Sequence, residues 1–204
     1  MNVCVLVLAA GLARRFGSDK RLATLADGRR VIDAHLDQIS SCGLPLLVGI
    51  RDGDTELAAV LGQRSIPFHH CAHADEGMGA TLAEAVAQLN AFDGVLISLA
   101  DMPWIKPTTY SAVAGALTTA TICVPYHAKL PGHPVGFGKD FFGELAALAG
   151  GSGARSLLTR HPDAVRELHV DDAGIHHDVD TPLDLRRQNN QTMNTHMENQ
   201  TQCK

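Results

Sequence analysis

Apolar runs of strand length alternate with segments of helical periodicity through residue 125, and this alternation restricts the chain to few folds. The first run, Val3 to Leu8, has no polar residue, as expected for a strand that is covered on both faces of a parallel sheet. The pattern predicts helices at 31–41, 55–61, 79–89 and 108–117, and further strands at 44–50, 65–69, 94–100 and 120–124. Such alternation indicates an α/β fold: a Rossmann-like, doubly wound, mostly parallel sheet in a three-layer α/β/α arrangement.

The alternation is less regular after Pro125, where we expect a short strand at 134–138, helices at 141–148 and 154–160, and a strand at 165–170. A chain of 204 residues suits one domain, which we assign to residues 1–187. Residues 188–204 have almost no apolar side chains to bury, so we expect a disordered C-terminal tail.

Composition excludes several classes of protein. A net charge of -5 is unlike a general nucleic-acid binder, and no apolar run approaches the roughly 20 residues of a membrane span. The apolar N-terminal run lacks the basic residues of a signal peptide, so we expect it to remain as a strand. Five widely spaced cysteines without a CxxC pair indicate reduced thiols, and the predicted location is cytoplasmic.

The stretch LAAGLARRFGSDK, residues 8–20, follows the first strand with glycines and three cations, Arg14, Arg15 and Lys20. Ligands of such sheets bind beyond the carboxyl ends of the strands, and glycines with cationic donors suit a polyphosphate. The spacing fits neither the Walker A loop nor GxGxxG. Composition alone therefore favours a solvated basic loop.

Asp101 follows the strand predicted at 94–100 and is a possible Mg²⁺ ligand, although an aspartate in a turn before proline is equally common. Asp178 and Asp180 lie two residues apart, and so on one side of an extended chain. The sequence Asp180-Thr181-Pro182 also suits a helix start. The segment with His69, His70, Cys71 and His73 has no partner pair at zinc spacing, so we interpret it as a strand end and loop.

Taken together, these stretches resemble the nucleotidyltransferases related to molybdenum cofactor guanylyl- and cytidylyltransferases. LAAGLARRFGSDK is similar to their LAAGxSxRFGxxK signature, and further blocks follow in the same order over residues 3–187. They are GMGATL (77–82), LADMP (99–103), GHPVGF (132–137), GAR (153–155) and DVDTPLDL (178–185). The resemblance implies a nucleotide-diphospho-sugar-transferase-like fold, Mg²⁺, and transfer of a nucleotidyl group from an NTP to a phosphorylated acceptor with release of pyrophosphate.

The resemblance also implies roles for individual residues. Arg15 and Lys20 would grip the triphosphate and, with Asp101, form the catalytic set. Asp101 and Asp180 would be the metal ligands, with Asp178 as a possible neighbour. The nucleotide would contact Leu8, Ala9, Ala10, Gly11, Gly77, Met78 and Gly79, and the acceptor would contact Gly132, His133 and Arg155.

Ala10 and the GHPVGF block make the chain more similar to the cytidylyl-transferring branch, which implies CTP rather than GTP, with molybdopterin as acceptor. Pro131 stands where relatives often have an arginine before the GHPV block, and Gly151 stands where they often have an acidic residue before the GAR block. Both positions lie in the acceptor-binding half. Two alternatives are a sugar-phosphate or other small-molecule cytidylyltransferase and a non-catalytic nucleotide-binding partner of a molybdoenzyme or of its chaperone. Arg15, Lys20, Asp101 and Asp180 together favour the enzyme.

Overall fold

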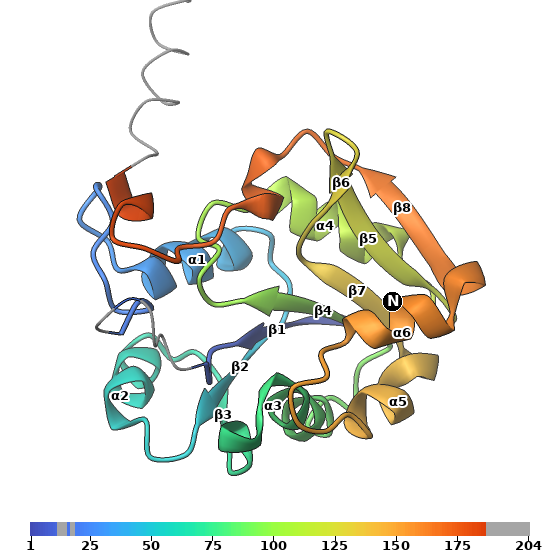
Figure 1. Cartoon of the computed structure of the whole chain (residues 1–204), viewed down its shortest axis with the longest axis horizontal. Helices are drawn as coiled ribbons and strands as arrows, with labels where there is room; N and C mark the ends of the chain where they lie inside the picture. Colours follow the sequence, from blue (N-terminus) through green and yellow to red (C-terminus); the bar gives the residue numbers. More distant parts are fainter. Residues whose placement is uncertain (12–15, 17–18, 187–204) are drawn as a thin grey trace, which may run out of the picture.

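The structure, a computed structural model, describes residues 1–11, 16 and 19–186. Within these residues one eight-stranded sheet has the strand order β3-β2-β1-β4-β7-β5-β6, with β8 also paired to β5 (Figure 1). The strands are β1 (Val3–Leu8), β2 (Leu46–Arg51), β3 (Phe68–Cys71), β4 (Gly94–Leu99), β5 (Ile122–His127), β6 (Leu130–Pro131), β7 (Val135–Gly138) and β8 (Val165–His169).

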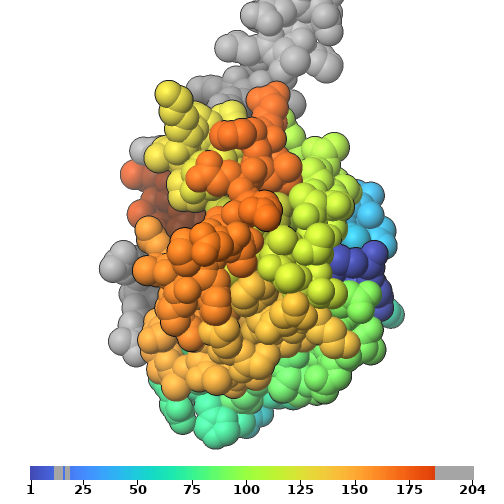
Figure 2. Space-filling view, turned by 90° about the vertical axis from the view of Figure 1, so that its right-hand side faces the viewer, coloured from blue at the N-terminus to red at the C-terminus, as the bar shows by residue number. Residues whose placement is uncertain are grey.

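The sheet is mostly parallel, as predicted. β1 pairs in parallel with β2 and β4, β2 with β3, and β5 with β8. β7 runs antiparallel between β4 and β5, and β6 is antiparallel to β5. The β8 edge, with α5 and α6, forms one side of the molecule, and the turn between β5 and β6 projects above it (Figure 2).

Helices cover both faces of the sheet and confirm the three-layer prediction. They are α1 (Val31–Ser40), α2 (Thr55–Gln63), α3 (Met78–Val86), α4 (Pro107–Ala116), α5 (Phe142–Ala146) and α6 (Arg155–Arg160). Val3, Val5 and Val7 of β1 pack in one core with α1, α2 and α4. Cys4, Leu6 and Leu8 pack in the other core with α3, α5 and α6. β1 is therefore buried on both faces, as its unbroken apolar sequence predicts.

Four predicted elements need correction. The helix expected at 79–89 is Met78–Val86. The strand expected at 65–69 is Phe68–Cys71, because the chain turns at Ser65, whose φ is +54°, and Pro67 has no N–H to donate. The strand expected to stop before Pro125 continues to His127, with the Pro125 carbonyl accepting the Gly132 N–H at 2.8 Å. The helix expected at 141–148 is shortened to Phe142–Ala146 after a 3₁₀ turn, Lys139–Phe141.

No α-helix begins at Thr181-Pro182 within the described residues. A 3₁₀ turn, Asp184–Arg186, follows there instead, and the Asp184 carboxylate accepts the backbone N–H groups of Asp180 and Thr181. Further 3₁₀ turns occur at Ala74–Glu76, Pro162–Ala164 and Ala173–His176. The predicted tail, 188–204, lies outside the described residues.

Successive strands are added to one side of β1 as far as β3, and later strands are added to its other side. β2 and β3 lie on one side of β1, and after β3 the chain crosses the other face through α3 to place β4 on the opposite side of β1 (Figure 1). β1 and β4 are thus neighbours at the point where the strand order reverses, and ligands of such sheets bind at the carboxyl ends of the strands there. The C-terminal segment reaches this region, since Val179 and Leu185 pack with Leu25 and Val31.

Candidate active site

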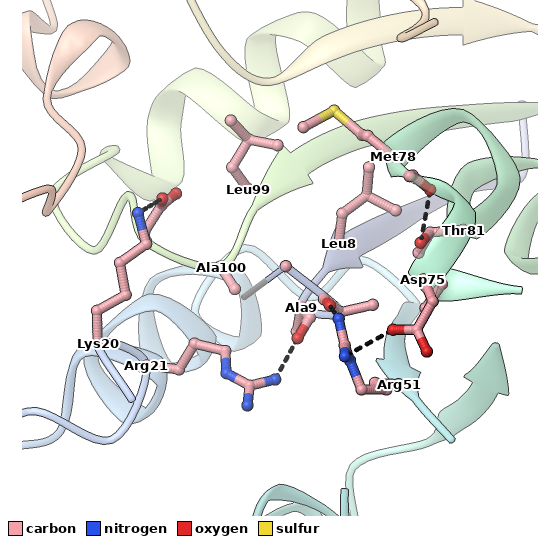
Figure 3. Close-up of a pocket in the computed structure, with 15 residues that line it drawn as sticks. Leu8, Ala9, Lys20, Arg21, Arg51, Asp75, Met78, Thr81, Leu99 and Ala100 are labelled. Carbon is pink, nitrogen blue, oxygen red and sulfur yellow. Dashed lines mark hydrogen bonds and ion pairs between the residues drawn. The ribbon is translucent and has the colours of Figure 1, made fainter. Parts of the chain in front are cut away.

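A pocket of about 540 Å³ lies at the carboxyl ends of β1 and β4 (Figure 3). Its floor is the backbone that continues β1, where the Ala9 N–H donates to the Gly49 carbonyl at 2.8 Å and the Ala100 N–H donates to the Leu8 carbonyl at 3.2 Å. Predicted nucleotide contacts that line it are Leu8, Ala9, Ala10, Gly11, Lys20, Gly77 and Met78. The structure thus brings most of the predicted nucleotide set into one cavity.

Lys20 joins two carboxylates at one end of this pocket. Its Nζ lies 2.5 Å from Asp101 Oδ2 and 3.1 Å from Asp180 Oδ1. Burial lowers the pKa of Lys20, but the hydrogen bonds and charges of Asp101 and Asp180 outweigh it and raise that pKa above its ordinary value. Lys20 therefore stays protonated between two carboxylates that are far apart in the sequence.

Asp178 completes a cluster of three carboxylates. Asp101, Asp178 and Asp180 each offer an oxygen within 4.8 Å of the others. The backbone holds this arrangement, since the Val179 N–H donates to the Asp101 carbonyl at 2.8 Å. Burial and the negative charges of Asp180 and Asp101 raise the pKa of Asp178, against the opposing effect of Lys20.

The carboxylate cluster fits a hard divalent cation. Its donors are all oxygens, the ligands that Mg²⁺ and similar ions prefer, and such sites commonly use one or two carboxylates. Asp101 Oδ1 is buried and has no hydrogen-bond partner among the residues that the structure describes. A buried carboxylate oxygen is costly to leave unpaired, so an additional cation at Asp101 would satisfy it.

The two glycines of the GMG motif are required by packing. Gly77 has a φ of +128°, and a Cβ there would lie 2.6 Å from the Gly150 carbonyl oxygen. A Cβ on Gly79 would lie 2.5 Å from the Ser152 carbonyl oxygen, and the Gly79 N–H donates to Gly150 at 2.8 Å. Gly79 is not among the described residues that line the pocket. These glycines let the start of α3 approach the loop before α6.

The predicted acceptor residues lie in two places. Gly132 packs against Ile175, and the His133 N–H donates to the Ile175 carbonyl at 3.0 Å. Burial lowers the pKa of His133, although the Ile97 carbonyl, 3.5 Å from Nδ1, and the nearby charges of Asp101 and Asp178 oppose this shift. Arg155 is exposed at the start of α6, away from this cluster and close in sequence to Gly153, where a Cβ would lie 3.7 Å from the Met78 sulfur.

Arg15 lies outside the described residues. Of the two cations predicted to hold the triphosphate, the structure therefore shows the position of Lys20.

The pocket has two further arginines that the motifs did not identify. Arg21 donates to the Ala9 carbonyl and pairs with Asp54 at 2.7 Å. Arg51 donates to the Ala10 carbonyl at 3.2 Å and pairs with Asp75 at 2.7 Å (Figure 3). The position of Arg51 at the carboxyl end of β2, beside β1, was the signal that could have indicated it.

The fold and this pocket define a nucleotidyltransferase. Residues 5–165 match the family model of the MobA-like NTP transferase domain, and the chain belongs to that family. Among curated protein sequences, none matches the chain significantly. The resemblance found in the sequence is therefore confirmed at the level of the family.

Solved structures agree with this assignment. Rv0371c from Mycobacterium tuberculosis H37Rv is 30% identical with a TM-score of 0.80, over 91% of this chain and 96% of that one. A manganese complex of Rv0371c gives 30% identity and a TM-score of 0.76, over 92% and 97% of the chains. Molybdopterin-guanine dinucleotide biosynthesis protein A from Archaeoglobus fulgidus shares the fold, at 20% identity and a TM-score of 0.65, over 94% of this chain and 99% of that one.

Within the described residues, no helix combines the length and apolar character needed to cross a membrane.

Proposed function

We propose that this nucleotidyltransferase moves CMP from CTP to the terminal phosphate of molybdopterin and releases pyrophosphate. The observation that carries the proposal is the convergence of Lys20, Asp101 and Asp180 at one end of the pocket between β1 and β4. The Archaeoglobus relative acts in molybdopterin-guanine dinucleotide biosynthesis, which supports a pterin phosphate as acceptor.

The nucleotide would lie along the pocket, with its base and ribose over Leu8–Gly11 and beside Gly77 and Met78. Lys20, with Arg15, would hold the triphosphate. Ala10, which lines the pocket, is one of the residues that make the chain more similar to the cytidylyl-transferring branch, and this resemblance supports CTP.

The chemistry needs no dedicated general base. A phosphate oxygen of the acceptor forms the new bond to the α-phosphorus, and the bond from that phosphorus to the bridging oxygen breaks as pyrophosphate leaves. A terminal phosphate is already nucleophilic at neutral pH, and both reactants are anions. Holding them in line and neutralising their charge are therefore the main tasks of the protein.

Asp101 and Asp180 would hold the divalent cation, proposed to be Mg²⁺, with Asp178 beside them. When bound, the ion would supply positive charge next to the phosphate oxygens. The manganese complex of Rv0371c supports a divalent cation in this family. Gly132, His133 and Arg155 are proposed to contact the acceptor, and His133 lies close enough to Asp101 and Asp178 for their charges to affect its pKa.

The test is a pyrophosphate-release assay with each of the four NTPs, molybdopterin, and either Mg²⁺ or Mn²⁺. We expect release with CTP and molybdopterin together, and near-background release when the acceptor is omitted. Asp101→Asn should reduce turnover strongly, and near-normal turnover would remove Asp101 from the metal site. Release with a sugar phosphate but not with molybdopterin would favour the alternative cytidylyltransferase. NTP binding without any turnover would favour a non-catalytic partner of a molybdoenzyme or of its chaperone.

A further inference from the structure

A second group of metal-binding side chains lies outside the pocket. His69, Cys71 and Glu84 each offer a ligand atom within 4.8 Å of the others. His69 and Cys71 are two residues apart on β3, so their side chains share the face that α3 covers, and Glu84 belongs to α3. Sequence spacing could not reveal this group, because its third member comes from a different element.

The three side chains differ in their present contacts. Within the described residues, no hydrogen bond or ion pair engages the His69 ring, which is partly buried. The Cys71 thiol is free, fully buried, and donates only weakly, to the Thr81 and His69 carbonyls at 3.7 and 3.9 Å. The imidazole and the sulfur therefore have no strong partner in this part of the chain that a metal ion would have to displace.

Glu84 is held in place by its surroundings. Its Oε2 accepts the Ala72 N–H at 2.8 Å, and its Oε1 accepts the His73 N–H at 2.7 Å and contacts His73 Nδ1 at 2.7 Å. A carboxylate has about four lone-pair sites, so these contacts leave room for a metal bond. Bonds of this kind orient metal ligands in known sites.

We propose that His69, Cys71 and Glu84 form a binding site for one zinc-class divalent cation, separate from the carboxylate cluster at Asp101. Imidazole, thiolate and carboxylate are the ligands that Zn²⁺ takes, and three protein ligands leave one tetrahedral position for water. Binding would break the Cys71 S–H bond, release that proton to solvent and form a sulfur–metal bond. The ion would join the edge strand β3 to α3.

Cobalt(II) provides a direct test, because it replaces zinc and gives a cobalt–thiolate absorption band. The full chain, stripped of metal with a chelator, is titrated with Co²⁺ and then with Zn²⁺. We expect a thiolate band that saturates at one equivalent and is abolished by Zn²⁺. Absence of the band in the wild-type chain would overturn the proposal, whatever happens in the variants.

Variants assign the band to this site. Cys71→Ala should abolish it, and His69→Ala and Glu84→Gln should each weaken Co²⁺ binding at least tenfold. Two matched controls should keep it: His70→Ala, an exposed neighbour whose side chain points to the opposite face of β3, and Cys42→Ala, a partly buried thiol elsewhere. Survival of the band in Cys71→Ala would contradict the assignment.

A second measurement does not depend on absorption. Zn²⁺ should raise the thermal midpoint of the wild type and of His70→Ala, because it binds the folded state, and should leave Cys71→Ala unchanged. Asp180→Asn should retain the thiolate band, since the carboxylate cluster offers only oxygens. If that variant loses turnover but keeps the band, the carboxylate cluster and the site at Cys71 are independent of each other.

Discussion

At the scale of single residues, the position of Lys20 has a consequence for the order of ligand binding. Its ammonium group lies between Asp101 and Asp180, where it balances charges that a divalent cation would also balance. In our proposal, the cation and the triphosphate arrive together, so Lys20 can move from the carboxylates to the phosphates. The same side chain then serves both the empty and the substrate-bound protein.

Lys20→Met tests this role. The substitution removes the charge but keeps much of the apolar stem, so kcat should fall by about 100-fold or more, the usual cost of losing one charge-stabilising donor. Lys129→Met, in the exposed turn after β5, is the matched control and should have near-normal turnover. Steady-state pyrophosphate release measures both, and equal activity of the two variants would exclude Lys20 from the reaction.

At the scale of elements, α1 is tied to the end of β4 through a buried histidine. His35 is fully buried, its Nδ1 lies 2.8 Å from the Met102 carbonyl oxygen, and its Nε2 lies 3.2 Å from Ser98 Oγ. Tyr110 of α4 contacts the same Ser98 hydroxyl at 2.9 Å. The network fixes the backbone on both sides of Asp101, and so it positions a candidate metal ligand.

Burial lowers the pKa of His35 from 6.5 to about 4, which makes stability depend on pH. The unfolded chain takes up this proton below about pH 6.5 and the folded chain does not, so stability is present above pH 6.5 and decreases on acidification. We expect this group to remove roughly 2 kcal/mol from the free energy of unfolding between pH 7 and pH 5. Urea unfolding at both pH values measures it.

His35→Gln should be less stable at pH 7 but should lose less stability on going to pH 5. His70→Gln, which alters an exposed ring, should keep the wild-type dependence. An unchanged pH dependence in His35→Gln would contradict the assignment to this residue.

The start of α3 provides a prediction about packing. Gly79→Ala would place a methyl group 2.5 Å from a backbone oxygen of Ser152, so one of the two segments must shift. We expect a loss of about 1–3 kcal/mol in the free energy of unfolding, as for other overpacked sites. Gly62→Ala in α2, where a Cβ would meet no described atom beyond the surrounding backbone of its own helix, should instead be neutral or stabilising by up to about 1 kcal/mol.

The elements differ in how far their sequences predict them. The limits of β1, β4, α1 and α4 agree with the prediction to within one residue, because burial on known faces dictates the pattern. The prediction for β3 is misplaced because the turn at Ser65 and Pro67 outweighs the apolar pattern. The antiparallel insertion of β7 between β4 and β5 is not predicted, because strand partners far apart in the chain leave no local signal.

At the scale of the whole molecule, the site joins residues that are far apart in the sequence, so part of it cannot be recognised before the chain folds. Motifs identify Asp101, Asp178 and Asp180, and only folding shows that they meet. Arg21 and Arg51 are missed because their roles depend on carbonyls of Ala9 and Ala10, whose direction the sequence does not reveal. The resemblance assigns the GMG glycines to the nucleotide, whereas their immediate physical role is the close approach of α3 to residues 149–152.

Truncation tests the domain assignment. A chain that ends at Arg187 should keep the thermal midpoint and the turnover of the full chain. A chain that ends at His177 loses the fully buried Val179 and both C-terminal carboxylates, so turnover should fall by about 100-fold or more and the midpoint should decrease. Circular dichroism melting and pyrophosphate release measure the two effects, and full activity of the shorter chain would remove Asp178 and Asp180 from the site.

The separation of Lys20 and Asp180, 160 residues apart in the chain, also affects how the protein matures. A nascent chain on the ribosome can form β1 and β4 and display Asp101 long before Asp180 is translated. Until then Lys20 has one of its two carboxylate partners and the metal site lacks a ligand. The order of synthesis thus delays competence for nucleotide chemistry until almost the whole folded domain has been made, so incomplete translation products would not consume nucleotide.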